Sequence, residues 1–159
     1  MKAKYINPFI VATSEVFARQ LECSVTRSQL YATANFTPIF DITGIIGMSG
    51  TAEGCVAISL SREVAIQATA FMLQQPPSSE IDDDVADAVG EIANMIAGSS
   101  RADLEQDQLQ ITVPIVKIGK SELIDFPKKS YPICIGFDSA WGPLAIQVGL
   151  QTLGEGESG

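Results

Sequence analysis

The chain has 159 residues, 46% of them hydrophobic, which is enough for one folded domain with a buried core. Its formal net charge is −9 and it has no histidine, so it would repel nucleic acid and anionic lipid, and it lacks the commonest general base and transition-metal ligand. The three cysteines, Cys23, Cys55 and Cys134, are far apart and form no CxxC motif; they read as small buried side chains in a reducing compartment.

No stretch of the sequence predicts a signal peptide or a membrane span. Pro8 interrupts the short apolar run at the N-terminus, Glu15 follows soon after, and no segment reaches the roughly 18 consecutive apolar residues of a membrane helix. We therefore expect a cytoplasmic protein with neither membrane nor nucleic acid as a partner. The expected organisation is a single domain over residues 1–153 with a disordered tail over residues 154–159.

The first half of the chain predicts a helix, a β region and a second helix. Asn7 is a suitable N-cap for the first helix, because Pro8 fits the first helical turn. Glycines at residues 47–54 predict a hairpin turn within the β region. Ser61 is the expected cap of the second helix. The predicted bounds are residues 8–21, 24–60 and 62–73.

The second half predicts a third helix followed by short strands. Ser79 with Asp82 resembles a capping box that starts the helix. Pro114 interrupts the first strand, residues 108–118, and so marks an edge or a bulge. Two further strands alternate strictly between apolar and other residues, as in a sheet with one buried and one wetter face. The pattern favours an α+β fold with a mixed or antiparallel sheet and helices packed on one face.

The third helix has two distinct faces. At about 100° per residue, four apolar residues form a narrow stripe that should be buried: Val85, Val89, Ile92 and Ile96. A second arc lies nearly opposite and contains Asp84, Asp87, Glu91, Asn94 and Gly98. A polar arc is expected on any amphipathic helix, so periodicity alone favours an ordinary solvated face.

Three details of the polar arc are unfavourable for a helix and so suggest a function. Asp87 and Glu91 are like charges four residues apart. Asn94 is a poor residue in the middle of a helix. Gly90 and Gly98 each cost about 1 kcal/mol relative to alanine, although Gly98 is also compatible with a C-terminal cap, and its missing side chain would let another backbone approach.

The spacing of Asp87, Glu91 and Asn94 resembles the signature of the CheC/CheX phosphatases. That signature is an acidic residue or serine, three residues, Glu, two residues, Asn, and then a proline some twenty residues on. Here the motif is set in the sequence GEIANMIAG, and the proline is Pro114. The opening INPFI is also similar to CheX, and the likeness covers essentially the whole chain. CheC-type members carry a second site on the first helix. In this chain Glu15 is followed by Ala18 where an asparagine is required, which matches the CheX pattern with one site.

The resemblance implies a CheC-like fold and a phosphatase that hydrolyses the aspartyl phosphate of a CheY-like response regulator, in chemotaxis or related two-component signalling. Glu91 would pair with a lysine of the phosphorylated receiver domain, and Asn94 would hold the attacking water. Asp84, Asp87 and Gly98 would contact the partner, although the two aspartates are equally compatible with ordinary solvated charges.

The resemblance also implies no cofactor or metal of the chain's own, because the response regulator supplies Mg²⁺, and it implies a homodimer. One alternative is a non-catalytic CheC-like scaffold or binding domain that interacts with signalling or flagellar switch proteins. Another is a metal-dependent hydrolase that uses residues 82–84, which is disfavoured because adjacent helical residues point about 100° apart.

Overall fold

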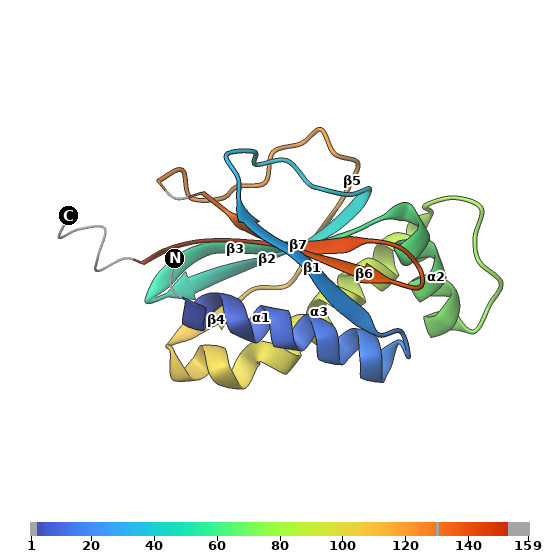
Figure 1. The fold of residues 1–159 in the computed structure, drawn as a ribbon, viewed down its shortest axis with the longest axis horizontal. Coiled ribbons are helices and arrows are strands. Elements are labelled where there is room, and N and C mark those ends of the chain that lie inside the picture. Colours follow the sequence, from blue (N-terminus) through green and yellow to red (C-terminus); the bar gives the residue numbers. More distant parts are fainter. Residues whose placement is uncertain (1–2, 130, 153–159) are drawn as a thin grey trace.

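The computed structural model describes residues 3–129 and 131–152, which form an antiparallel sheet with helices on one face (Figure 1). The helical elements are α1 (Ala3–Glu15), the π-helix η1 (Val16–Gln20), α2 (Arg62–Leu73) and α3 (Asp83–Gln106). The strands are β1 (Val25–Ala32), β2 (Ile42–Gly50), β3 (Ala52–Leu60), β4 (Leu109–Ile111), β5 (Ile115–Ile118), β6 (Ile133–Ser139) and β7 (Leu144–Thr152). The sheet order is β1-β6-β7-β3-β2-β4, and β5 also pairs with β2. The predicted α+β fold class is confirmed.

The main core lies between the helices and the sheet. It includes fully buried aromatic residues of the first helical segment, Phe9 and Phe17, and fully buried isoleucines of β2 and β3. The predicted apolar stripe of α3 is also confirmed. Its four members, Val85, Val89, Ile92 and Ile96, each have 0% of their surface exposed.

Gly44 allows α3 to pack closely on β2. A Cβ atom at this position would lie 2.9 Å from the Cβ of Ala93 and 3.5 Å from the carbonyl oxygen of Val89. Real Cβ atoms do not approach one another so closely, so no larger residue fits without moving the helix. This contact fixes the distance between α3 and the sheet.

The opposite face of the sheet is also covered, which corrects the expected wetter face. A smaller apolar cluster there joins β3 to the chain that precedes β6, and Phe126 packs directly on Gly149 of β7. Seven consecutive residues of β7, from Leu144 to Leu150, are buried as a result. Apolar and other residues alternate along β7, but both sets are buried. The reason is that irregular segments of the chain cover the face of the sheet that the helices do not cover.

The three cysteines are buried and free, as expected for core residues. Burial raises the pKa of the Cys55 thiol to about 12, with a smaller contribution from the nearby Asp125 carboxylate. Burial likewise raises the pKa of Cys134 to about 11. Both thiols are therefore protonated at neutral pH and behave as small apolar side chains.

The first helix begins earlier than predicted. It starts at Ala3, and Pro8 lies inside it rather than in its first turn. Tyr5 and Ile6 explain the difference, because both are buried in the core, and their burial offsets the hydrogen bond that proline cannot donate. The helix then continues as η1, and Leu21 after it is fully buried.

The third helix, predicted over residues 81–98, begins later and ends later in the structure, at Asp83 and Gln106. Its N-cap is Asp82, whose carboxylate accepts a hydrogen bond from the backbone N–H of Val85 at 3.0 Å, so the expected capping box from Ser79 is wrong. A carboxylate at this position also interacts favourably with the helix dipole. The helix runs on to Gln106, so Gly98 lies inside it and is not its C-terminal cap.

Other predicted boundaries agree with the structure. Helix α2 has its predicted bounds, and Ser61 caps it by accepting a hydrogen bond from the backbone N–H of Val64. The hairpin between β2 and β3 is confirmed, as is the division of residues 108–118 at Pro114 into β4 and β5.

The predicted tail, residues 154–159, lies outside the described residues. No helix in the described part of the chain combines the length and apolar character needed to cross a bilayer.

Two glycine substitutions test the packing of α3 in opposite directions. We expect Gly44→Ala to lower the free energy of unfolding by about 1–3 kcal/mol, because the added methyl group overlaps Ala93. Gly98→Ala should raise it by about 0.5–1 kcal/mol, because Gly98 is exposed inside a helix and a Cβ atom there meets nothing within 4 Å. Urea denaturation measures both, and a neutral Gly44→Ala would contradict the close packing.

Candidate functional site

Helix α3 exposes its whole polar arc. Its apolar stripe faces the sheet, so the opposite side of the helix is left in solvent. All five residues singled out in the sequence are exposed on this side: Asp84, Asp87, Glu91, Asn94 and Gly98. Glu91 and Asn94 are three residues apart, so they are neighbours on the helix surface.

Glu91 and Asn94 have no side-chain partner within the described part of the chain. Neither forms a hydrogen bond or an ion pair there, although a carboxylate and an amide can together make several. These two are free to bind atoms of another molecule.

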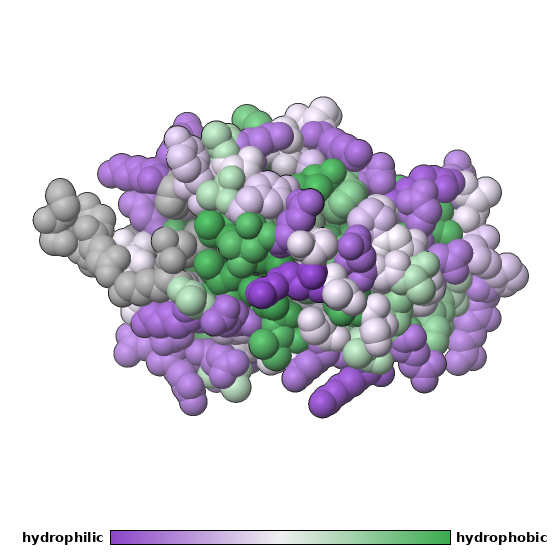
Figure 2. Space-filling model, viewed as in Figure 1, coloured by the Kyte–Doolittle hydropathy of each residue, from purple (hydrophilic) through white to green (hydrophobic). Residues whose placement is uncertain are grey.

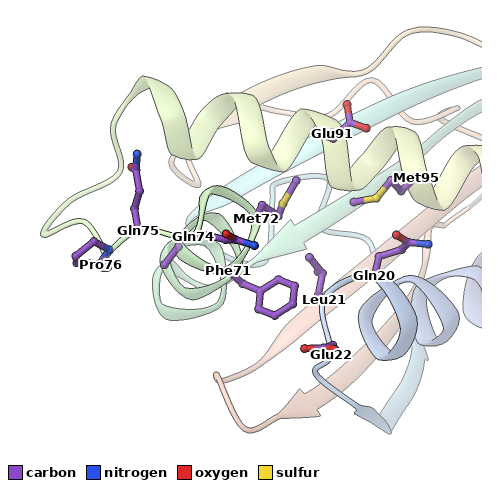
Figure 3. Close-up of a pocket in the computed structure, with 11 residues that line it drawn as sticks. Gln20, Leu21, Glu22, Phe71, Met72, Gln74, Gln75, Pro76, Glu91 and Met95 are labelled. Atoms are coloured by element: carbon purple, nitrogen blue, oxygen red, sulfur yellow. The ribbon is translucent and has the colours of Figure 1, made fainter.

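Beside Glu91 lies an open groove of about 940 Å³ between η1, the end of α2 and α3 (Figure 3). Met95 extends from α3 toward Leu21, and the ring of Phe71 lies on the α2 side of the same space. The lining residues are Gln20, Leu21, Glu22, Ala70, Phe71, Met72, Gln74, Gln75, Pro76, Glu91 and Met95. Of the five predicted residues, only Glu91 belongs to this groove.

The sequence did not reveal the rest of the groove. Glu22 follows η1, whereas Phe71 and Gln74 are at the end of α2, and only the fold brings these two segments together beside α3. The nearest sequence signal is Pro76, which indicates that α2 ends just before it. No pattern of residue types marks the turn at Glu22.

The first helix does not provide a second copy of the site. Glu15 accepts a hydrogen bond from the hydroxyl of Ser99 at 3.4 Å, and so already has a partner within the chain. Ala18 is exposed at the position where a second asparagine would stand. Among the described residues, α3 alone carries the complete Glu and Asn pair.

Asp82 has a structural role that conflicts with the metal-hydrolase alternative. Its hydrogen bond from the Val85 backbone N–H lowers the pKa of its carboxyl group, and Ser78 also donates to it. Within residues 3–129 and 131–152, no three His, Cys, Asp or Glu side chains are grouped so as to hold a metal ion. The run of three aspartates therefore serves the helix start.

The chain is similar to known proteins over most of its length. The family described as "Chemotaxis phosphatase CheX" matches residues 42–138. The CheY-P phosphatase CheX of Thermotoga maritima is 25% identical over 137 residues, which cover 85% of this chain and 86% of that protein.

Solved structures extend the similarity to nearly the whole chain. A CheC-like superfamily protein from Shewanella sp. PV-4 has a TM-score of 0.84 and 25% identity, over 95% of this chain and 99% of that one. A structure of the CheX-CheY-BeF3-Mg²⁺ complex from Borrelia burgdorferi contains a similar chain, with a TM-score of 0.76 and 23% identity over 92% of this chain and 97% of that one. The family match spans more than half of the chain, and the protein therefore belongs to the CheX family and has the CheC-like fold.

Proposed function

We propose that this protein removes the phosphoryl group from the aspartyl phosphate of a CheY-like response regulator. The observation that carries the proposal is the exposed Glu91 and Asn94 pair on α3, which has no partner in the described chain and stands at the positions of the family signature. Membership of a family described as chemotaxis phosphatases supports the same reaction. The Borrelia complex of CheX with CheY supports a receiver domain as the partner.

The proposed reaction needs orientation more than a strong base. Water attacks the phosphorus atom, the bond from phosphorus to the aspartyl oxygen breaks, and aspartate and inorganic phosphate are released. Asn94 holds the water in line with that bond, its amide oxygen accepting a hydrogen bond from the water. Glu91 forms an ion pair with a lysine of the receiver and so fixes α3 at the phosphorylated aspartate. Mg²⁺ belongs to the receiver and neutralises charge on the phosphoryl oxygens.

The rest of the polar arc would form the docking surface. Asp84 and Asp87 precede Glu91 along the same exposed side of α3. Their negative charges would orient the receiver as it docks. Gly98 follows Asn94 by one turn, and the space beside it is open for another backbone. These assignments belong to the same proposal, because each residue lies on the surface that a receiver must cover to reach Asn94.

We also propose that the protein forms a homodimer through its sheet. Strand β1 lies at one edge, and almost all of its residues are exposed. Leu30 of β1 and Val11 of α1 are more than half exposed, at 56% and 54%. Figure 2, viewed as in Figure 1 with β1 nearest the reader, shows a hydrophobic area beside α1. An uncovered edge strand that exposes apolar side chains such as Leu30 favours pairing with another chain.

Two alanine substitutions separate the roles of Asn94 and Glu91. Asn94→Ala should slow dephosphorylation by about 10²–10³ while still binding a receiver activated with beryllofluoride, because the amide acts mainly in the transition state. Glu91→Ala should weaken binding about tenfold or more and also slow hydrolysis, because it removes a charged contact in the complex. Single-turnover rates, binding titrations and melting curves should be measured together.

Glu105→Ala is the matched control, because Glu105 is an exposed glutamate on the same helix, beyond the polar arc. It should keep wild-type binding, rate and stability. Full activity of Asn94→Ala would exclude the catalytic assignment. A wild-type protein that binds the receiver without accelerating hydrolysis would be a non-catalytic binding domain.

Mg²⁺ should be required only through the receiver. Calorimetric titration of the isolated protein is expected to show no tight Mg²⁺ site, because the carboxylates of α3 lie along a helix and do not surround a common point. Dephosphorylation in a mixture with the receiver should nevertheless stop when EDTA is added. A micromolar or tighter site on the isolated protein would instead support the metal-hydrolase alternative.

The homodimer is tested by sedimentation at micromolar concentration. We expect a dimer in the wild type, and Leu30→Lys should shift it toward monomer because the charge is placed on the exposed apolar edge. The polar arc of α3 should stay accessible in the dimer, because burial of the Asp87 and Glu91 carboxylates would be costly. A wild type that sediments only as a monomer would count against this proposal.

A further inference from the structure

We propose that the groove between η1, α2 and α3 receives a lysine or arginine side chain of the receiver, and that Glu22 and Gln74 recognise it. The inference rests on the proposed function and adds a recognition site away from the reacting atoms. It assigns roles to two residues outside the α3 polar arc. The occupant is one basic side chain on the receiver surface beside the phosphorylated aspartate.

The chemistry of the groove favours a side chain with an apolar stem and a cationic head. Leu21 at its base is fully buried, Met72 and Met95 are half-buried, and Phe71 is 38% exposed. An aliphatic stem can pack on these apolar groups, and a cation can lie near the aromatic ring.

The rim of the groove supplies hydrogen-bond acceptors and negative charge. Glu22 and Glu91 lie on different sides of it, and Gln20, Gln74 and Gln75 add amide oxygens. No lysine or arginine lines it within the described part of the chain. An anionic group would therefore be repelled, while a guanidinium or ammonium group would find the Glu22 carboxylate and several amide oxygens.

The backbone at two rim residues is in a conformation that favours glycine. Glu22 has a φ of 52° and Gln74 has a φ of 53°. Only one other non-glycine residue in the described chain has a positive φ, Gln108, which lies outside the groove. L-residues adopt this left-handed region at a cost, and glycine would adopt it more readily.

A side chain is not needed to make either turn. At the end of α2, the backbone N–H of Gln74 donates to the carbonyl oxygens of Ala70 and Phe71, a cap that glycine forms equally well. The chain nevertheless places a glutamate and a glutamine at these two positions, facing one groove. Unfavourable backbone conformations of this kind concentrate at functional sites.

The groove is continuous with the candidate site. Glu91 lines the groove and neighbours Asn94 on α3. A receiver that places its phosphorylated aspartate at Asn94 can therefore also reach the groove opening. The predicted charge on that part of the receiver is positive, which complements the acidic rim and the net charge of −9.

The experiment replaces Glu22 and Gln74 by glycine, one at a time. Glycine removes the side chain and adopts the positive φ at these positions more readily. Glu22→Gly and Gln74→Gly are expected to melt at or above the wild-type temperature. Each should raise the KM for a phosphorylated receiver and the Kd for its beryllofluoride form by about five- to tenfold, with kcat within about twofold. Gln108→Gly is the matched control, with the same backbone change outside the groove, and should leave KM, Kd and kcat unchanged.

Salt dependence distinguishes the two rim residues. Glu22→Gly removes a charge, so receiver binding should become less sensitive to ionic strength, whereas Gln74→Gly should keep the wild-type dependence. Glu22→Gln keeps the size of the side chain and should show the same loss of salt dependence. This variant provides a second measurement if the glycine variant proves less stable than the wild type.

The outcomes separate this inference from the proposed function. Wild-type KM and Kd in both glycine variants would overturn the inference, while the Asn94→Ala result would still decide the catalytic role. If the wild type binds the receiver without hydrolysing its phosphate, the proposed function fails and the Kd values alone decide the inference. Self-association that is lost in Glu22→Gly would also overturn it, because the occupant would then be a second copy of the chain.

Discussion

The contact between α3 and β2 is the constraint on which the rest of this structure depends. Gly44 leaves room for Ala93, and the four fully buried residues of the α3 stripe fill the space on either side. A helix held this closely cannot rotate about its axis without overlap. Glu91 and Asn94 are on the opposite side of the same helix, so the packing that builds the core also orients the site. The precision of the site therefore comes from apolar contacts that include neither of its residues.

The sheet is a stable platform for this helix because both of its faces are covered. On the face away from the helices, Phe126 packs on Gly149, and the segment before β2 is bound by polar groups of the strands. The Gln147 amide donates to the carbonyl oxygen of Thr37, and the Ser59 hydroxyl accepts from the backbone N–H of Phe40. Buried polar side chains of this kind hold irregular chain in one conformation. The helix side is consequently where the candidate site and its groove are found.

The residues proposed for function occupy two kinds of position in the fold. Asn94 and Glu91 are on a long regular helix, whose rigid backbone suits the orientation of a water molecule and a charge. Glu22 and Gln74 are at turns, where backbone conformation is unfavourable for their side chains. A protein selected for stability alone would carry glycine at such turns. At Glu22 and Gln74 the proposed recognition of a partner would offset this cost.

The sequence by itself determined the helices and strands with strong periodicity and the α3 residues that form the candidate site. The stripe and the polar arc follow from the helical repeat, which is a local property of the chain, and the single complete signature follows from Ala18. Only the tertiary structure decided the start of α1, because the burial of Tyr5 and Ile6 outweighs the preference of Pro8 for a first turn. The tertiary structure also determines that both faces of β7 are buried and that a groove lies beside Glu91. These features depend on segments distant in sequence meeting in space, and no local pattern of residues records which segments will meet.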